Sequence, residues 1–375
     1  MACVKFPWEL MEEILYRVPS LSLSRFKTVS KEWNTLLNDK TFIKKHLALV
    51  RPQFLLWTNS KVYSVDVSLN DDPNIELREL PLDIPYVIDH RTTNFLPCND
   101  LLFCASWWSN KAVVWNPSLR QTRLIKSGEE HFRFGGIGYD SGRPGKGYHI
   151  FGHSHSRLSV NGNTSKFIKR FYITKFESNA WKCIDDVSLG ENSIGGDSLD
   201  NNNVSLNGNL YWTTNSYDTD EYLIQSFDFS KEIFKIFCVL PRKKDSSDIP
   251  VLSVFRGDRL SVLHKFKGTN NMEIWVTKNK INESVKAVVW MMFMTVSIPI
   301  YKDSKPSYFI NDIYEKRLVM CCSDENGKAC VYIVNVQARK KIQLGFHVSE
   351  FSHCFYDPSL IPIPSETSGQ KISNS

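Results

Sequence analysis

Three histidines are the first residues whose type and spacing could support chemistry. His149, His153 and His155 share one parity along a predicted strand, and imidazole nitrogens on one face of a strand can bind a metal ion. No Asp, Glu or Cys nearby completes a coordination sphere. We therefore interpret them as surface histidines at a strand end that runs into an exposed loop, Ser154–Ser165, and expect no metal site.

A glycine-rich segment, Gly135–Gly147, is the second candidate, because such loops can hold phosphate groups. Gly147 stands where a Ser or Thr would bind magnesium, and the next residues, Tyr148–Phe151, have the pattern of a strand. No helix N-terminus is then available for an anion. The segment is better explained as a long turn between strands, and we expect no cofactor.

Motifs of catalysis are missing from the sequence. It contains no G-x-S-x-G elbow and no H-E-x-x-H zinc motif, and the paired carboxylates at Asp71-Asp72 and Asp185-Asp186 stand among turn residues. A triad assembled from distant residues stays open, because sequence spacing does not reveal it. The prediction is a protein that is not an enzyme.

Residues 6–48 have a helical rhythm. Pro7 suits the first turn of a helix, apolar residues follow at steps of three and four, and Pro19 ends the run. A second segment begins near Ser22 and a third extends from Ser30 to Leu47. The spacing predicts three short helices in a domain at residues 1–50, which is too small to bury all of its apolar side chains.

After Pro52 the apolar rhythm changes to period two, which predicts short strands separated by tight turns. The expected hairpin turns are Asn59-Ser60, Ser109-Asn110, Ser178-Asn179, Asn207-Gly208, Gly257-Asp258 and Asn326-Gly327. Blades of four strands take about 40 to 50 residues, so residues 52–360 would hold six or seven. The predicted class is therefore multidomain α+β: a small all-α unit, a large all-β, propeller-like domain, and a disordered tail at 361–375.

Composition excludes several classes of protein. The chain has 375 residues, 42% of them hydrophobic, and a net charge of +6, half of which lies in the first 50 residues. Nucleic-acid binders concentrate basic residues in a stripe, which this sequence lacks. Nine cysteines without C-x-x-C spacing predict reduced thiols. The longest apolar run, Ala287–Met294, is too short to span a bilayer, so we expect no membrane partner and a location in the cytoplasm or nucleus.

The N-terminal segment closely resembles a plant F-box over about 40 residues. The resemblance rests on these motifs: Phe6-Pro7-Trp8-Glu9-Leu10, Glu13-Ile14-Leu15, Arg17-Val18-Pro19, Arg25-Phe26-Lys27, Val29-Ser30-Lys31 and Trp33. Later motifs resemble the F-box-associated interaction domain, which is kelch-like, in family order: Val114-Trp115-Asn116-Pro117, Gly136-Ile137-Gly138-Tyr139-Asp140, Asn179-Ala180-Trp181-Lys182, Asn207-Gly208-Asn209-Leu210-Tyr211-Trp212, Ser226-Phe227-Asp228-Phe229-Ser230 and Glu273-Ile274-Trp275.

This resemblance implies a substrate-recognition subunit of an SCF-type cullin ubiquitin ligase. The F-box would bind a Skp-type adaptor, and through it the cullin scaffold, while the β domain holds an unknown target protein. Because the short helices cannot bury every apolar side chain, we expect some to contact the adaptor. The expected contacts are Phe6, Pro7, Leu10, Ile14, Leu23, Phe26 and Val29. For each of them, a place in the F-box's own core is the alternative.

Other functions stay open at this point. The chain could keep an F-box whose role is vestigial or unrelated to the ligase, with the β domain as an independent protein-interaction module. Two further rivals are an oxidase that uses a propeller and the histidines around His153, and a nucleic-acid binder that uses the N-terminal helices.

In the β domain, Trp115, Trp181, Trp212 and Trp275 are expected to pack between strands, and Asn116, Asn207, Gly208 and Asp228 to fix turns. Target-binding residues are left to the loops: Trp107-Trp108, Gly142–Gly147, Ser154–Ser165, Gly195–Asn203 and Asn215–Asp220.

Overall fold

The computed structural model describes most of the chain. The described residues are 7–49, 51–58, 61–70, 72–81, 93–98, 101–106, 109–129, 131–140, 142, 147–160, 164–178, 180–184, 203–216, 219–243, 249–266, 268–282, 287–301, 304–312, 314, 316–347 and 351–364. Of these, the side chains of 48, 155–160, 164–168, 249, 312 and 351 are not described.

Four helices form the N-terminal unit, where the sequence predicted three. They are α1 (Trp8–Leu15), α2 (Ser20–Phe26), α3 (Lys31–Asn38) and α4 (Lys40–Leu49). The expected third helix is divided at Asp39, whose carboxylate Oδ1 accepts hydrogen bonds from the backbone N–H groups of Thr41 and Phe42, both at 2.9 Å. A side-chain acceptor at this position starts a new helix, so the three-helix prediction was wrong.

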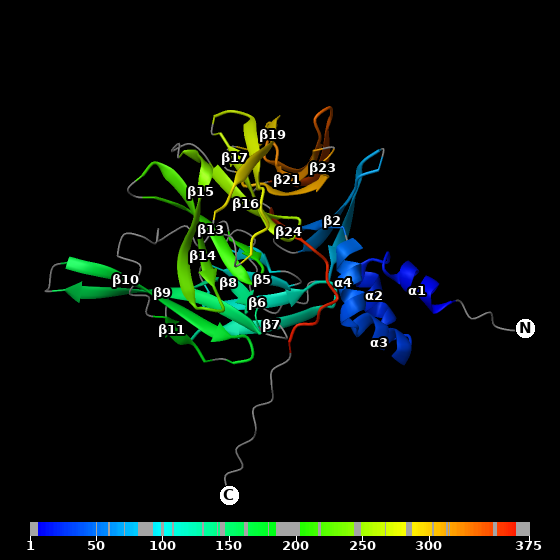
Figure 1. Ribbon diagram of the computed structural model, residues 1–375, viewed down its shortest axis with the longest axis horizontal. Coiled ribbons are helices and arrows are strands. Elements are labelled where there is room, and N and C mark those ends of the chain that lie inside the picture. The colour runs from blue at the N-terminus through cyan, green and yellow to red at the C-terminus, as the bar shows by residue number, and fades with distance from the viewer. Residues whose placement is uncertain are drawn as a thin grey trace, which may run out of the picture.

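The rest of the described chain folds into six antiparallel sheets of four strands each, the blades of a propeller (Figure 1). The sequence allowed six or seven blades. The first two sheets consist of β24 (Phe351–Tyr356), β1 (Gln53–Thr58), β2 (Val62–Ser68) and β3 (Asn74–Leu80), and of β4 (Thr93–Cys98), β5 (Leu101–Ser106), β6 (Lys111–Asn116) and β7 (Gln121–Lys126). Because β24 pairs with β1, the last strand completes the first blade and closes the ring.

The other four sheets follow the chain in order. The third has β8 (Phe132–Tyr139), β9 (Tyr148–Val160), β10 (Thr164–Lys175) and β11 (Lys182–Ile184); the fourth has β12 (Val204–Leu206), β13 (Asn209–Asn215), β14 (Glu221–Asp228) and β15 (Ile233–Lys243). The fifth has β16 (Ile249–Phe255), β17 (Arg259–Lys265), β18 (Asn271–Thr277) and β19 (Trp290–Ser297), and the sixth β20 (Ser307–Asp312), β21 (Arg317–Ser323), β22 (Lys328–Val334) and β23 (Arg339–His347). One strand of each blade lines a central cavity of about 370 Å³.

Apolar side chains fill the space between blades. Trp57, Trp115 and Trp212 are at most 1% exposed, and the Trp57 ring packs edge-on against Trp115 with centroids 5.4 Å apart. Trp181 and Trp275 are only partly buried, although both pack against these cores. All eight described cysteines are free thiols, six of them buried, as the sequence predicted.

Two sequence predictions about the third blade were wrong. Residues 154–160, expected in an exposed loop, continue β9, which pairs with β10 through Val160. His153 is therefore buried, with its ring 5.9 Å from that of Phe171, and not a surface residue. Gly135–Gly138 belong to β8, not to a turn, and a Cβ on Gly138 would meet the Phe229 ring at 2.2 Å. These glycines permit close packing between blades, while residues 143–146 lie outside the described chain.

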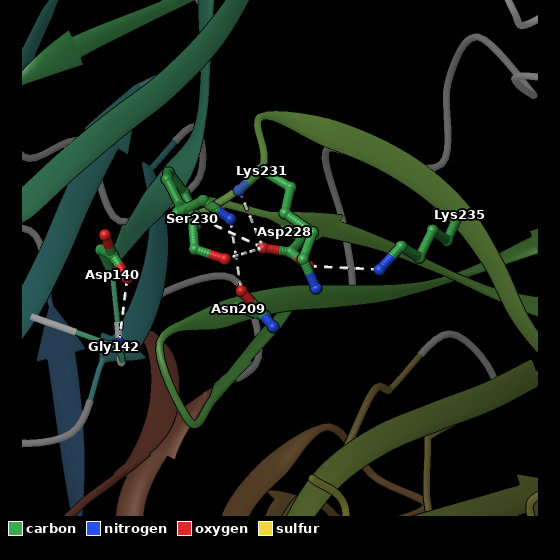
Figure 2. A network of polar contacts seen from close by, with 8 residues as sticks. Asp140, Gly142, Asn209, Asp228, Ser230, Lys231 and Lys235 are labelled. Carbon is green, nitrogen blue, oxygen red and sulfur yellow. Dashed lines mark hydrogen bonds and ion pairs between the residues drawn. The ribbon is translucent and has the colours of Figure 1, made fainter. Parts of the chain in front are cut away.

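The turn after β14 shows how polar residues hold the blades in shape (Figure 2). Asp228 Oδ1 accepts hydrogen bonds from the Ser230 hydroxyl at 2.6 Å and from the backbone N–H groups of Ser230 and Lys231 at 3.1 Å each. Its Oδ2 lies 3.2 Å from the Lys235 ammonium. Burial opposes ionisation of Asp228, but these hydrogen bonds and charges hold the pKa of the carboxyl below its usual value.

Other expected turns are confirmed. Asn207 and Gly208, with φ of 51° and 85°, join β12 to β13, and Gly257 joins β16 to β17. A Cβ on Gly208 would lie 2.2 Å from the Tyr139 carbonyl oxygen, so no other residue fits without a shift. Asn116 also fixes a turn, since its Oδ1 accepts a hydrogen bond from the Leu119 N–H at 3.1 Å.

The helical unit and the propeller share an interface built on the C-terminal segment 357–364, which follows β24. In Figure 1 this red segment passes the blue helices and reaches β7. Leu360 is fully buried in the core of the helical unit, and the Ser20 hydroxyl donates to the Pro358 carbonyl at 3.3 Å. Residues 361–364, placed in a disordered tail by the sequence, are held instead: the Ile361 carbonyl accepts from Asn116 Nδ2 at 2.7 Å, and the Ile363 N–H donates to Gln121.

Candidate adaptor-binding site

Helix α1 has one buried and one exposed apolar face. It begins after Pro7, whose carbonyl accepts the Met11 N–H at 3.2 Å. Leu15 is buried on the inner face, whereas Leu10 and Ile14 are 52% and 54% exposed on the other. Pro7, Leu10 and Ile14 are spaced at i, i+3 and i+7, which places them along one side of the helix. We call these three residues the α1 stripe.

The loop between α2 and α3 carries a further exposed apolar residue. Val29 is 64% exposed just before Ser30, whose hydroxyl caps α3 by accepting the Trp33 N–H at 3.2 Å. Phe26, at the end of α2, is half-buried, because its ring packs edge-on against Trp33 with centroids 5.1 Å apart. The cap fixes the path of the loop and thereby holds Val29 toward solvent.

A compact core supports both elements. Tyr16 stacks on Phe42 with ring centroids 4.7 Å apart, and His46 Nε2 lies 2.9 Å from the Val18 carbonyl oxygen. Burial lowers the pKa of His46, so its ring favours the neutral form inside this core. Burial and the hydrogen bond to Glu12 raise the pKa of Tyr16. The helices are thus held by a core that does not include the side chains of the α1 stripe.

The expected adaptor contacts differ in their exposure. Pro7, Leu10, Ile14 and Val29 are exposed, and Phe26 is half-buried. Leu23 is fully buried in the core of the helical unit, which is the alternative that the sequence left open for each residue. Phe6 lies outside the described residues. Sequence reasoning missed Trp8, which is 41% exposed in the first turn of α1; its signal was a large aromatic next to the stripe.

The other candidate sites of the sequence do not come together. Within the described ranges, no three His, Cys, Asp or Glu residues are grouped so that they could hold a metal ion. No helix in the described part of the chain is long and apolar enough to cross a membrane. Of the loops expected to bind the target, Trp107-Trp108 and most of Gly142–Gly147 and Gly195–Asn203 lie outside the described residues.

Comparison with known proteins agrees with this two-part architecture. The profile of the F-box domain matches residues 4–45, and that of the F-box associated beta propeller domain matches residues 53–363. The chain is 99% identical to the F-box protein At1g12190 of Arabidopsis thaliana over the full length of both. It is 54% identical to the Arabidopsis F-box/kelch-repeat protein At1g12170, over 97% of this chain and 100% of that protein.

A third relative extends the similarity to a more distant member. The Arabidopsis protein SUPPRESSOR OF NIM1 1 is 42% identical over 96% of this chain and 98% of its own length. Both domain profiles and the full-length relatives therefore cover the helical unit and the propeller together. The chain belongs to the family of plant F-box proteins that carry an F-box associated beta propeller domain.

Proposed function

We propose that this protein is a substrate-recognition subunit of an SCF-type ubiquitin ligase. The α1 stripe, together with Val29, docks in an apolar groove of a Skp-type adaptor, which connects the chain to the cullin. The observation that carries the proposal is a helix whose inner face is buried while Leu10 and Ile14 remain half-exposed. Burying each such side chain in a groove stabilises the complex by roughly 1.5–3 kcal/mol.

The propeller holds the target on the face away from the F-box. Two chain connections, from α4 into β1 and from β24 to Pro358, lie on the face where the F-box contacts the blades. The target protein binds on the opposite face, where β24 and the other strands that line the central cavity begin. The subunit acts by proximity, because it raises the effective concentration of target lysines near a charged conjugating enzyme and needs no nucleophile of its own. It works in the cytoplasm or nucleus.

The test is co-purification with a Skp-type adaptor. We expect the full chain to form a stoichiometric complex and Leu10→Glu/Ile14→Glu to lose it, because two carboxylates cannot enter an apolar groove without large desolvation costs. The matched control is Ile236→Glu/Val239→Glu on the outer strand β15, where the two side chains are 58% and 44% exposed. This control should bind like the unchanged chain.

Substitution is a sharper test than deletion of the F-box. Because Leu360 and Leu119 pack in the core of the helical unit, a chain without residues 1–50 would expose them and disturb the propeller. If the folded, unchanged chain fails to bind the adaptor, the ligase proposal is wrong. The propeller would then be an independent protein-interaction module attached to a vestigial F-box.

A further inference from the structure

A cleft of about 660 Å³ lies where the F-box meets the propeller. One wall is formed by α2 and α3, with Arg25, Lys27, Asn34 and Asn38 among its residues. The other wall is formed by the β6–β7 turn, which includes Arg120, and by the C-terminal segment. We call it the junction cleft, and neither the adaptor-binding proposal nor the target-binding face uses it.

The charges of the junction cleft are all of one sign. Arg25, Lys27 and Arg120 line it, and none of its lining residues is acidic. The Arg25 and Arg120 side chains form no ion pair with any residue that the structure describes. Lys27 Nζ donates to Asn38 Oδ1 at 2.7 Å, and burial lowers the pKa of Lys27. An anion in the cleft would give these three cations a counter-charge that no described residue provides.

The walls of the cleft are already fixed by hydrogen bonds. Asn116 holds the β6–β7 turn through the Leu119 N–H and binds the C-terminal segment through the Ile361 carbonyl at 2.7 Å. Gln121 Oε1 accepts the Ile363 N–H at 2.9 Å. A ligand would therefore meet cations carried on a preformed frame, which lowers the entropy lost on binding.

We propose that the junction cleft binds a small, multiply charged phosphate compound. Guanidinium groups match phosphate oxygens in paired hydrogen bonds, and here they come from both domains, Arg25 from the F-box and Arg120 from the propeller. The cations lie around one cleft and not along a stripe, so the site suits a compact polyanion better than nucleic acid. A bound polyanion would link the two domains and favour one orientation of the target relative to the adaptor.

The test uses the full-length chain with inorganic tripolyphosphate as the probe, followed by calorimetry and thermal unfolding. Arg25→Gln/Arg120→Gln should weaken binding by at least about tenfold, since each substitution removes the charge-assisted hydrogen bonds of one guanidinium group. The matched control is Arg256→Gln, because Arg256 is an exposed turn arginine with the same φ of 55° as Arg120. Sodium sulfate at equal ionic strength separates specific binding from general screening.

Tripolyphosphate binding that the control retains and the double variant loses, with no comparable effect of sulfate, supports the proposal. Absence of binding to the unchanged chain, or equal binding by all three proteins, overturns it. A third arm offers an acidic peptide in place of tripolyphosphate. If only the peptide binds and the double variant loses it, the phosphate proposal is wrong and the cleft receives a protein segment. Adaptor binding is not needed for any of these readings.

Discussion

The F-box and the propeller differ in how completely they bury their large apolar side chains. In the F-box, Leu10, Ile14 and Val29 are more than half exposed, although their neighbours form a tight core. In the propeller, each blade buries its faces against the next, and Trp57 and Trp212 are almost completely covered. A closed ring of blades can hide its apolar residues, whereas four short helices have too little interior.

Exposure alone does not distinguish the two regions. The outer strands β15 and β19 also present apolar side chains, including Ile236 and Met291, because each is the last strand of its blade. The F-box differs in that two of its exposed residues, Leu10 and Ile14, lie on an amphipathic helix whose opposite face packs into the core through Leu15. A surface of this shape suits a groove on a partner, and the comparison can be tested by damaging each region in turn.

The largest expected effect comes from opening the ring. A chain that ends after His347 lacks β24, so the first blade loses the strand paired with β1 and the apolar faces of the ring are no longer sealed. We expect no cooperatively folded propeller, measured by near-ultraviolet circular dichroism and calorimetry. A chain that ends after Pro364 keeps β24 and the packed C-terminal segment and should unfold at the same temperature as the full chain. Equal stability of both truncated chains would contradict the closed-ring account.

The second prediction compares two leucines of the F-box. Leu23 is fully buried, so Leu23→Ala should lower the free energy of unfolding of the helical unit by about 2–5 kcal/mol. Leu10 is half-exposed, and Leu10→Ala should change it by less than about 0.5 kcal/mol. Hydrogen exchange of the amides in α1–α4 measures both. Similar losses in the two variants would show that the α1 stripe belongs to the F-box core.

The smallest effect concerns a histidine inside the propeller. His264 is fully buried with both ring nitrogens unpartnered among the described residues, and burial lowers its pKa to about 4. The unfolded chain has a histidine pKa near 6.5, so only the unfolded state binds this proton between pH 6.5 and 4. Stability is therefore full above this window and falls as the pH drops, by about 2 kcal/mol at pH 5.

The substitution His264→Phe should remove that part of the acid sensitivity. Its measurement is chemical unfolding at pH 7 and pH 5, where the difference between the two values should shrink by about 2 kcal/mol in the variant. The nearby charges are Glu273, which raises the pKa of His264, and Arg242, which lowers it. An unchanged pH difference would mean that the ring is protonated in the folded propeller.

Local sequence patterns predicted the individual strands and turns better than they predicted how the blades close into a ring. The strands of period two and turns such as Asn207-Gly208 could be predicted, because each depends on a few neighbouring residues. The break at Asp39 had a local signal, a carboxylate acceptor ahead of a helix, that was overlooked. The exact number of blades and the pairing of β24 with β1 depend on contacts between distant residues, which one sequence without a strict repeat does not reveal.

The candidate site shows the same division. Periodicity placed Leu10 and Ile14 on one side of α1, but it could not separate them from Leu23, because all three are leucine or isoleucine at helical spacing. Which face is covered depends on where α4 and Leu360 pack, and Leu360 comes from the other end of the chain. The junction cleft was invisible for the same reason, since Arg25 and Arg120 meet only in the folded protein.

The pairing of β24 with β1 also has a consequence for how the protein is made. The two strands are separated by about 300 residues, so their contact is among the slowest to form. One edge of β1 stays unpaired while the other blades fold. The F-box is synthesised first, and local contacts let its helices form early. A nascent chain can thus expose its α1 stripe while β1 still has an unpaired edge, long before the propeller closes.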